Sequence, residues 1–286
     1  NSDDVTHSVK LIHEFDDTLS AYISHSTGFK AISTNLGANA TVYAGLPMDP
    51  SIYFANPEEA ENFEVGFKKT FSNGYLNMSF FHMAVEGYQS NLFIGTGFNL
   101  VNIGEQTNKG VEIDSLFFLN ENFVLTLAAS YIDATFNDFK NGPCDRTFVP
   151  PASDDCPIVN GGPARVKDFT GRRPSGVPEL AVTVSGTYTF DLTENMTGYI
   201  RGEYVYEDSY QATDAVPVEV PGAIRKVGTL NASLGVKDSA SGFSLMLWGR
   251  NINDDEFIYT GFNVPGSPGS YAGYPVVPRM WGLTLS

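Results

Sequence analysis

The feature that most constrains the fold of this chain is a period of two in its apolar residues. In the last stretch of the sequence, Trp281, Leu283 and Leu285 alternate with residues that are small or polar. The same alternation recurs in residues 123–137 and 178–190. A period of two predicts a β-strand with one apolar face and one small or polar face. A strand that separates lipid from a polar lumen has this pattern.

Counting the runs with this pattern predicts an all-β fold of about eleven strands. Many of these runs are longer than the roughly 5–6 residues of strands in globular proteins. They reach the about 9–11 residues that a tilted strand needs to cross a bilayer. The predicted strands are 7–15, 19–28, 59–71, 75–90, 98–118, 123–137, 178–190, 196–210, 225–238, 243–253 and 277–286.

The connections between these strands are of two kinds that alternate along the chain. Short polar turns such as Ser72-Asn73-Gly74 predict hairpins. Longer stretches rich in Pro, Gly, Asn and Asp lie between them, at about residues 29–58, 91–97, 138–177, 211–224 and 254–275. Outer-membrane barrels place short turns at the periplasmic end and long loops at the outer end. We therefore favour a transmembrane antiparallel β-barrel over a soluble β-sandwich, with residues 277–286 running toward the periplasm.

Composition and charge exclude several other classes of protein. The chain has 17 Lys and Arg against 33 Asp and Glu, a formal net charge of -16, which argues against a nucleic acid partner. No run of roughly 18 apolar residues is present to form a transmembrane helix. The acidic start of the sequence does not resemble a signal peptide. An odd number of strands cannot close a bacterial barrel of even strand number, so we expect a piece of a larger barrel.

Particular residues then resemble motifs of the TonB-dependent outer-membrane receptors. Each motif is weak alone, but five of them follow one another in the order found in the family. They are Ser24-His25-Ser26-Thr27-Gly28-Phe29-Lys30, Asn56-Pro57-Glu58 with Asn62-Phe63-Glu64-Val65-Gly66-Phe67-Lys68, Asn102-Ile103-Gly104-Glu105 with Lys109-Gly110-Val111-Glu112-Ile113, Gly249-Arg250-Asn251-Ile252-Asn253-Asp254, and Pro278-Arg279-Met280-Trp281-Gly282-Leu283-Thr284-Leu285.

The resemblance implies a receptor of about twenty-two strands whose lumen is filled by a plug. Residues 1–286 would then be the C-terminal half of the barrel, in one domain. The plug and its TonB-box segment would lie outside this sequence. Family members end on an aromatic residue that the barrel-assembly machinery reads, so we expect a few residues beyond Ser286.

The resemblance also implies a location and a set of partners. The location is the outer membrane of a Gram-negative bacterium. The partners are the TonB-ExbB-ExbD complex acting through the plug, outer-membrane lipid and lipopolysaccharide, the barrel-assembly machinery and a surface lipoprotein. The implied function is energy-coupled import of a scarce, large solute: a siderophore, haem, cobalamin or an oligosaccharide. The alternative is a passive outer-membrane channel or an adhesin, and a soluble secreted β-protein is a third reading.

Enzyme chemistry finds little support in the sequence. The four histidines lie on predicted strands, and no motif of a hydrolase, metalloprotease or nucleotide-binding loop is present at usable spacing. We expect no catalytic residue, no metal site and no cofactor. The acidic groups Asp154-Asp155 and Asp254-Asp255-Glu256 lack the ligand spacing of a calcium loop, which favours solvated loop charge over Ca²⁺ binding.

The long loop 138–177 is the first candidate for ligand binding, because structureless segments above roughly 12–15 residues are usually functional or disordered. Its two cysteines, Cys144 and Cys156, predict a local disulfide in an oxidising compartment. Its basic cluster suits an anionic ligand, or equally a pairing with lumenal or lipopolysaccharide charge. The cluster consists of Arg165, Lys167, Arg172 and Arg173.

Aromatic residues in the predicted loops are the second group of candidates for ligand binding. Their rings could stack on sugars or aromatic siderophores. They could equally belong to the aromatic girdle at the outer membrane interface. These residues are Phe93, Phe98, Tyr210, Tyr259, Phe262, Tyr271 and Tyr274.

Overall fold

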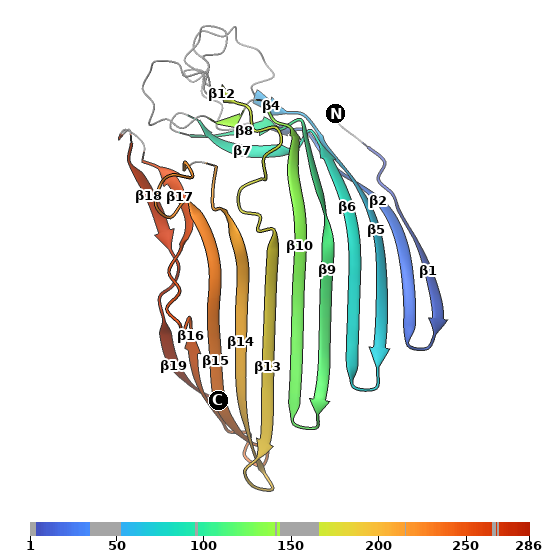
Figure 1. Cartoon of the computed structure of the whole chain (residues 1–286), viewed down its shortest axis with the longest axis vertical. Coiled ribbons are helices and arrows are strands. Elements are labelled where there is room, and N and C mark those ends of the chain that lie inside the picture. The colour runs from blue at the N-terminus through green and yellow to red at the C-terminus, as the bar shows by residue number, and fades with distance from the viewer. Residues whose placement is uncertain are drawn as a thin grey trace.

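The computed structural model describes most of the chain as one antiparallel sheet of eleven strands (Figure 1). The described residues are 4–34, 53–94, 97–140, 142–143, 166–214, 216–264, 267 and 269–286. No helix among these residues is long and apolar enough to cross a membrane. The strands of the sheet, in spatial order, are β1 (Ser8–Asp16), β2 (Leu19–Lys30), β5 (Glu58–Phe71), β6 (Gly74–Glu86), β9 (Glu105–Asn120), β10 (Phe123–Asp138), β13 (Leu180–Asp191), β14 (Met196–Gln211), β15 (Ile224–Asp238), β16 (Ser244–Arg250) and β19 (Met280–Leu285).

Spatial order equals sequence order, so each strand pairs with its neighbours along the chain, and β1 and β19 form the two edges. All the short turns lie at one end of the sheet, and all the long connections lie at the other (Figure 1). The predicted strand number, all-β class and sorting of the connections are confirmed. The long connections contain four smaller pairs: β3 (Ser33–Thr34) with β4 (Phe54–Ala55), β7 (Gln89–Ile94) with β8 (Gly97–Asn102), β11 (Gly142–Pro143) with β12 (Val166–Lys167), and β17 (Ile258–Asn263) with β18 (Tyr271–Pro275).

Three predicted strand ranges were wrong in their outer ends. The predicted strand 75–90 divides into β6 and β7, because the chain turns at Gly87 with a φ of 62°. The predicted strand 98–118 divides into β8 and β9, so the loop predicted at 91–97 is instead the tip of a β-hairpin. The predicted strand 243–253 ends at residue 250. Periodicity missed the first two breaks because strands lie on both sides of each, and it missed the third because the turn at residues 251–254 directly follows β16.

The two faces of the sheet differ sharply in chemistry, and the strand register defines them. One row across five strands consists of large apolar side chains that are 46% to 67% exposed. This row is Tyr188, Ile200, Leu234, Leu247 and Leu283. The adjacent row, on the opposite face, is Thr187, Arg201, Ser233, Trp248 and Gly282. A single layer whose apolar face is exposed has no packed core of its own, and it requires an apolar surrounding.

Many glycines in the strands lie directly opposite an aromatic residue of the next strand. A Cβ atom at Gly66 would overlap the ring of Tyr22, and one at Gly282 would overlap the indole of Trp248. The missing side chain leaves room for a ring to lie flat on the neighbouring backbone, which fixes the register of the pair. The pairs with this contact are Tyr22–Gly66, Phe117–Gly74, Phe81–Gly110, Phe190–Gly198, Tyr199–Gly235, Trp281–Gly249 and Trp248–Gly282.

The ladder between β15 and β16 ends at the pair Ala232–Gly249, and side chains that begin with Asn251 continue it. Asn251 is buried and holds a φ of 50°, and its amide group bonds both the N–H and the C=O of Asp255. The carboxylate of Asp255 accepts a bond of 2.7 Å from the N–H of Gly228, and Asn253 bonds the same residue's carbonyl at 2.6 Å. These side chains replace the missing backbone partners of β15.

We predict that Gly66→Ala destabilises the barrel by about 1–3 kcal/mol, because the methyl group displaces the Tyr22 ring from its neighbouring strand. Thermal unfolding in detergent, followed by circular dichroism, measures the effect. Gly202→Ala is the matched control, since a Cβ there meets no heavy atom within 4 Å. Equal melting temperatures for both variants would contradict the role of the aromatic–glycine contacts.

Candidate functional site

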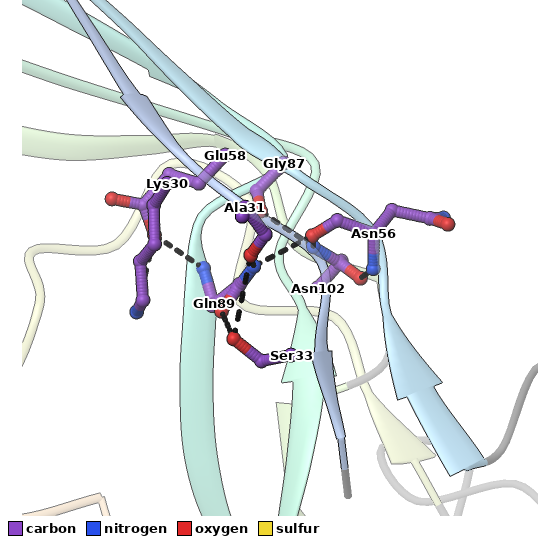
Figure 2. A network of polar contacts seen from close by, with 8 residues as sticks. All are labelled: Lys30, Ala31, Ser33, Asn56, Glu58, Gly87, Gln89 and Asn102. Atoms are coloured by element: carbon purple, nitrogen blue, oxygen red, sulfur yellow. Dashed lines mark hydrogen bonds and ion pairs between the residues drawn. The ribbon is translucent and has the colours of Figure 1, made fainter. Parts of the chain in front are cut away.

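The long connections meet at one end of the sheet and form a rim above the strands (Figure 1). Three sets of contacts hold the described part of this rim together: a polar network, an apolar cluster and an arginine surrounded by rings. The polar network, drawn in Figure 2, joins the outer ends of β2, β5 and β6.

Gln89 lies at the centre of the polar network and is 5% exposed. Its Nε2 donates to the carbonyl oxygens of Ala31 at 3.0 Å and Asn56 at 2.8 Å. Its Oε1 accepts a bond of 2.8 Å from Ser33 Oγ, and its backbone N–H donates to Glu58 Oε2, also at 2.8 Å. The side chain of Gln89 therefore joins the connection between β6 and β9 to both ends of the connection between β2 and β5 (Figure 2).

Asn102 completes the network on the next strand (Figure 2). Its Oδ1 accepts a bond of 2.7 Å from the N–H of Asn56. Its Nδ2 donates to the carbonyls of Asn56 at 3.0 Å and Gly87 at 2.6 Å. The amide groups of Gln89 and Asn102 thus satisfy backbone groups that no strand ladder reaches. The first residue of the family-like motif Asn102-Ile103-Gly104-Glu105 therefore has a structural role, which is to bond the backbone of Asn56 and Gly87.

The apolar cluster lies next to this network and joins the loop after β10 to the segment before β13. Its members are each 1% to 4% exposed, in contrast to the exposed apolar face of the sheet. The Phe139 ring lies edge-on to Phe136 at 5.0 Å and to Phe169 at 5.3 Å. The cluster consists of Ile103, Phe136, Phe139 and Phe169, with Tyr88 packed against it.

Arg225 at the start of β15 is the third centre of contacts. Its side chain is 15% exposed, and its Nη2 lies 3.0 Å from Glu207 Oε2. The rings of Tyr210, Phe257 and Tyr259 surround the guanidinium at 5.4, 4.9 and 5.0 Å from their centroids. Such a cation among rings is stabilised by both the ion pair and the ring quadrupoles.

Sequence reasoning missed Arg225, because a register shift between Glu207 and Tyr210 decides which side chains meet it. The structure brings two predicted residues, Tyr210 and Tyr259, to this arginine. Tyr210 is 7% exposed and donates a bond of 2.6 Å to Glu207 Oε2. Because the Tyr210 ring is buried, it is not part of the surface offered to a solute.

The β17–β18 hairpin presents the other predicted aromatic residues. Phe262 and Tyr274 contact each other with ring centroids 5.9 Å apart, and they are 38% and 61% exposed. Tyr259 is also 61% exposed, and Tyr271 is partly exposed opposite Asn263. Phe93 and Phe98 are opposite each other in the β7–β8 hairpin. The hairpins therefore carry most of the predicted aromatic set.

The predicted basic cluster does not meet at one point among the described residues. Arg173 donates to the carbonyl of Ile132 at 2.8 Å and pairs with Glu179 at 3.3 Å, which ties it to the barrel wall. Arg172 lies 4.7 Å from the ring of Phe169, and Lys167 pairs with Gly142 in the β11–β12 ladder. Arg165, Cys144, Cys156 and Asp154-Asp155 lie outside the described residues.

Two of the three acidic residues at 254–256 have a structural role. Asp254 pairs with Arg279 at 3.4 Å, and Asp255 bonds the backbone of β15. Among the described residues, no group of three or more His, Cys, Asp or Glu side chains is placed to hold a metal ion.

Comparisons with known proteins show which protein family the chain belongs to. Residues 1–252 match the sequence profile of the family described as TonB dependent receptor-like, beta-barrel. The chain belongs to this family, in the β-barrel region of the receptors. The family and the similar structures are receptors and transporters of the outer membrane. No curated protein matches the sequence.

Three solved structures illustrate the likeness in fold. The ferric yersiniabactin uptake receptor FyuA from Yersinia pestis has a TM-score of 0.67 at 15% identity, over 96% of this chain and 36% of that one. The siderophore receptor PiuA from Acinetobacter baumannii has a TM-score of 0.64 at 16% identity, over 98% and 35%. The copper transporter OprC has a TM-score of 0.62 at 10% identity, over 97% and 38%. The chain thus spans about a third of the length of these structures.

We predict that Gln89→Leu loosens the rim, because the carbonyl of Ala31 and the hydroxyl of Ser33 lose their bonds to Gln89, and the carbonyl of Asn56 keeps only its bond from Asn102. The expected cost is about 1–3 kcal/mol for groups left unsatisfied. Hydrogen–deuterium exchange should become faster in residues 31–34 and 54–57, while β13 and β14 keep their protection. Unchanged exchange at the rim would contradict the role of Gln89.

A second prediction concerns Asp214, which accepts a bond of 2.9 Å from Ser175 Oγ and so joins two loops of the rim. Burial raises the pKa of Asp214, against smaller opposing effects of Ser175 and Arg172. The folded state therefore binds this proton more tightly than the unfolded state, so its contribution to stability falls as pH rises from about 4 through the raised pKa. Asp214→Asn should stabilise the loop contact at pH 7 and flatten this pH dependence. Hydrogen–deuterium exchange rates of residues 175–176 and 211–214, measured across pH, check whether the stability of the loop contact falls as pH rises.

Proposed function

We propose that this chain is the C-terminal half of the barrel of a TonB-dependent receptor, with residues 1–286 in one domain. The receptor binds a large, scarce solute at its outer rim and imports it to the periplasm. The observation that carries the proposal is a family match over 1–252 on a sheet whose outward face is apolar and whose long loops meet at one end. The polar face is then the lumenal wall, and the apolar face contacts outer-membrane lipid and lipopolysaccharide.

Energy coupling is the part of this proposal that separates it from a passive channel or adhesin. The partners are a plug with its TonB box, and the TonB-ExbB-ExbD complex that acts on it. The barrel-assembly machinery inserts the barrel, and a surface lipoprotein can attach at the rim. A Gram-negative outer membrane is the location. Siderophore receptors among the similar structures favour a ferric siderophore as the first ligand class to test, ahead of haem, cobalamin and oligosaccharides.

The exposed rings of the β17–β18 hairpin are the surface we propose for capture. Tyr259 and Tyr274 lie on the two strands of the hairpin, and each is 61% exposed. Arg225 holds Tyr259 from behind, so the ring is positioned before the ligand arrives. The predicted residues of loop 138–177, with Cys144 and Cys156 as a disulfide, remain part of the proposed site.

We predict that Tyr259→Ala and Tyr274→Ala each weaken binding of a ferric siderophore by about 3- to 10-fold, the contribution of one aromatic contact. The measurement is a binding titration on the intact receptor, followed by uptake of labelled iron in cells. Tyr188→Ala is the matched control, an exposed tyrosine near the opposite end of the sheet.

Uptake must also stop when the proton gradient of the inner membrane is collapsed. Import that continues without the gradient would exclude the receptor and leave the passive channel. Binding that is unchanged in both hairpin variants would instead place the capture surface elsewhere on the rim.

A further inference from the structure

The apolar, outward face of the sheet carries a hollow of about 1040 Å³ beside the rim ends of β14 and β15. Tyr204 and Tyr206 of β14 line it, and both continue the outward side of the strand that begins with Ile200. The opposite wall consists of the segments 254–258 and 275–278. The hollow is as large as the biggest ordinary ligand sites, which enclose roughly 300–1,000 Å³.

The walls of this hollow are held in place by contacts within this chain. The Asp255 carboxylate accepts a bond of 2.7 Å from the N–H of Gly228, and Asp254 pairs with Arg279 at 3.4 Å, so the segment 254–258 is fixed beside β15. A Cβ atom at Gly228 would lie 3.0 Å from the Tyr204 hydroxyl, so the glycine keeps the floor open. Because the hollow faces away from the lumen, a plug inside the barrel does not fill it.

The hollow lies at the level where the outward face changes from apolar to charged. Along β15, the outward residues Leu234 and Leu230 are followed toward the rim by Lys226. On β9 and β10, the same change comes at the outward ion pair of Lys109 with Asp133, 3.1 Å apart. Tyrosines beside such a boundary are typical of a membrane interface. The headgroups of lipids lie at this level.

Two opposite charges that line the hollow form no ion pair with any described residue. They are Lys226 on β15 and Glu256 on the segment 254–258, and both are exposed. The Lys226 ammonium lies 5.9 Å from the centroid of the Tyr206 ring. The neighbouring carboxylate of Asp254 is neutralised by its pair with Arg279. One cation and one anion therefore remain to bind a ligand that carries both charges.

We propose that this hollow binds the phosphoethanolamine headgroup of a phospholipid. The phosphate accepts bonds from Lys226 and from the Tyr204 hydroxyl, and the ammonium group donates to Glu256, all of them charge-assisted. The acyl chains then lie along the apolar row toward Leu230 and Leu234. A headgroup with a phosphate but no amine would place its negative charge beside Glu256 without neutralising it. The inference rests on the proposed function only where that function places the outward face in lipid.

The test uses the intact receptor, with its plug, in detergent. Native mass spectrometry measures the binding of phosphatidylethanolamine and of phosphatidylglycerol with the same acyl chains. The native receptor should bind phosphatidylethanolamine about tenfold more tightly, the gain expected for one charged hydrogen bond. Lys226→Gln should weaken the binding of both lipids by about tenfold, because both carry the phosphate. Glu256→Gln should abolish the preference and leave the binding of phosphatidylglycerol unchanged or tighter.

Lys109→Gln is the matched control. It removes a lysine from the same face and a similar level, four strand spacings or about 19 Å away. It should change either affinity by less than about twofold, because a charge at that distance is screened.

Three results would overturn the proposal. The first is equal binding of the two lipids by the native receptor, which indicates a general affinity for anionic groups or acyl chains. The second is the same loss in Lys109→Gln as in Lys226→Gln, which indicates a field spread over the whole face. The third is a dimer without bound lipid, which indicates that a second copy covers the hollow. Uptake that ignores the proton gradient would refute the proposed function and leave the lipid preference standing, so the two failures are distinguishable.

Discussion

Satisfaction of backbone hydrogen bonds is the constraint on which the rest of this structure depends. A single-layer sheet in an apolar surrounding has no water on one face and no second layer to cover it. Its N–H and C=O groups must pair between strands, which favours long strands in uninterrupted antiparallel order. Where a strand stops, other groups have to continue the ladder. Asn251 and Asp255 do so at the end of β16, and Gln89 and Asn102 do so above β6 and β9.

The same constraint connects the fold to the rim. The amide side chains of Gln89 and Asn102 bond backbone groups beyond the strand ends, and these bonds also join separate loops. The hydrogen bonds that complete the backbone pairing therefore also stabilise the rim. The apolar cluster around Phe139 adds the buried surface that the sheet itself lacks. The β17–β18 hairpin, which we propose as the capture surface, is held separately, by the contact between Arg225 and Tyr259.

Much of the fold could be predicted from the sequence because a strand between lipid and lumen repeats every two residues. That period predicted eleven strands, their two faces and the sorting of short and long connections. It failed at Gly87, at residues 103–104 and at Asn251, where single residues turn the chain within runs that otherwise alternate. The site could be predicted only in part. Tyr210 and Tyr259 were named as aromatic candidates, but their meeting at Arg225 depends on a bulge in β14 that no local pattern indicates.

The sequence by itself determined the class of the protein, because the alternation, the turn residues and the family motifs each depend only on residues that are close together in the chain. The tertiary structure decided which side chains meet. Arg173 lies against the barrel wall, Arg225 lies among three aromatic rings, and Trp248 leans over Gly282. These arrangements depend on the register between strands that are far apart in the chain. A shift of one residue would send every one of these side chains to the other face, so their chemistry follows from pairing and not from composition.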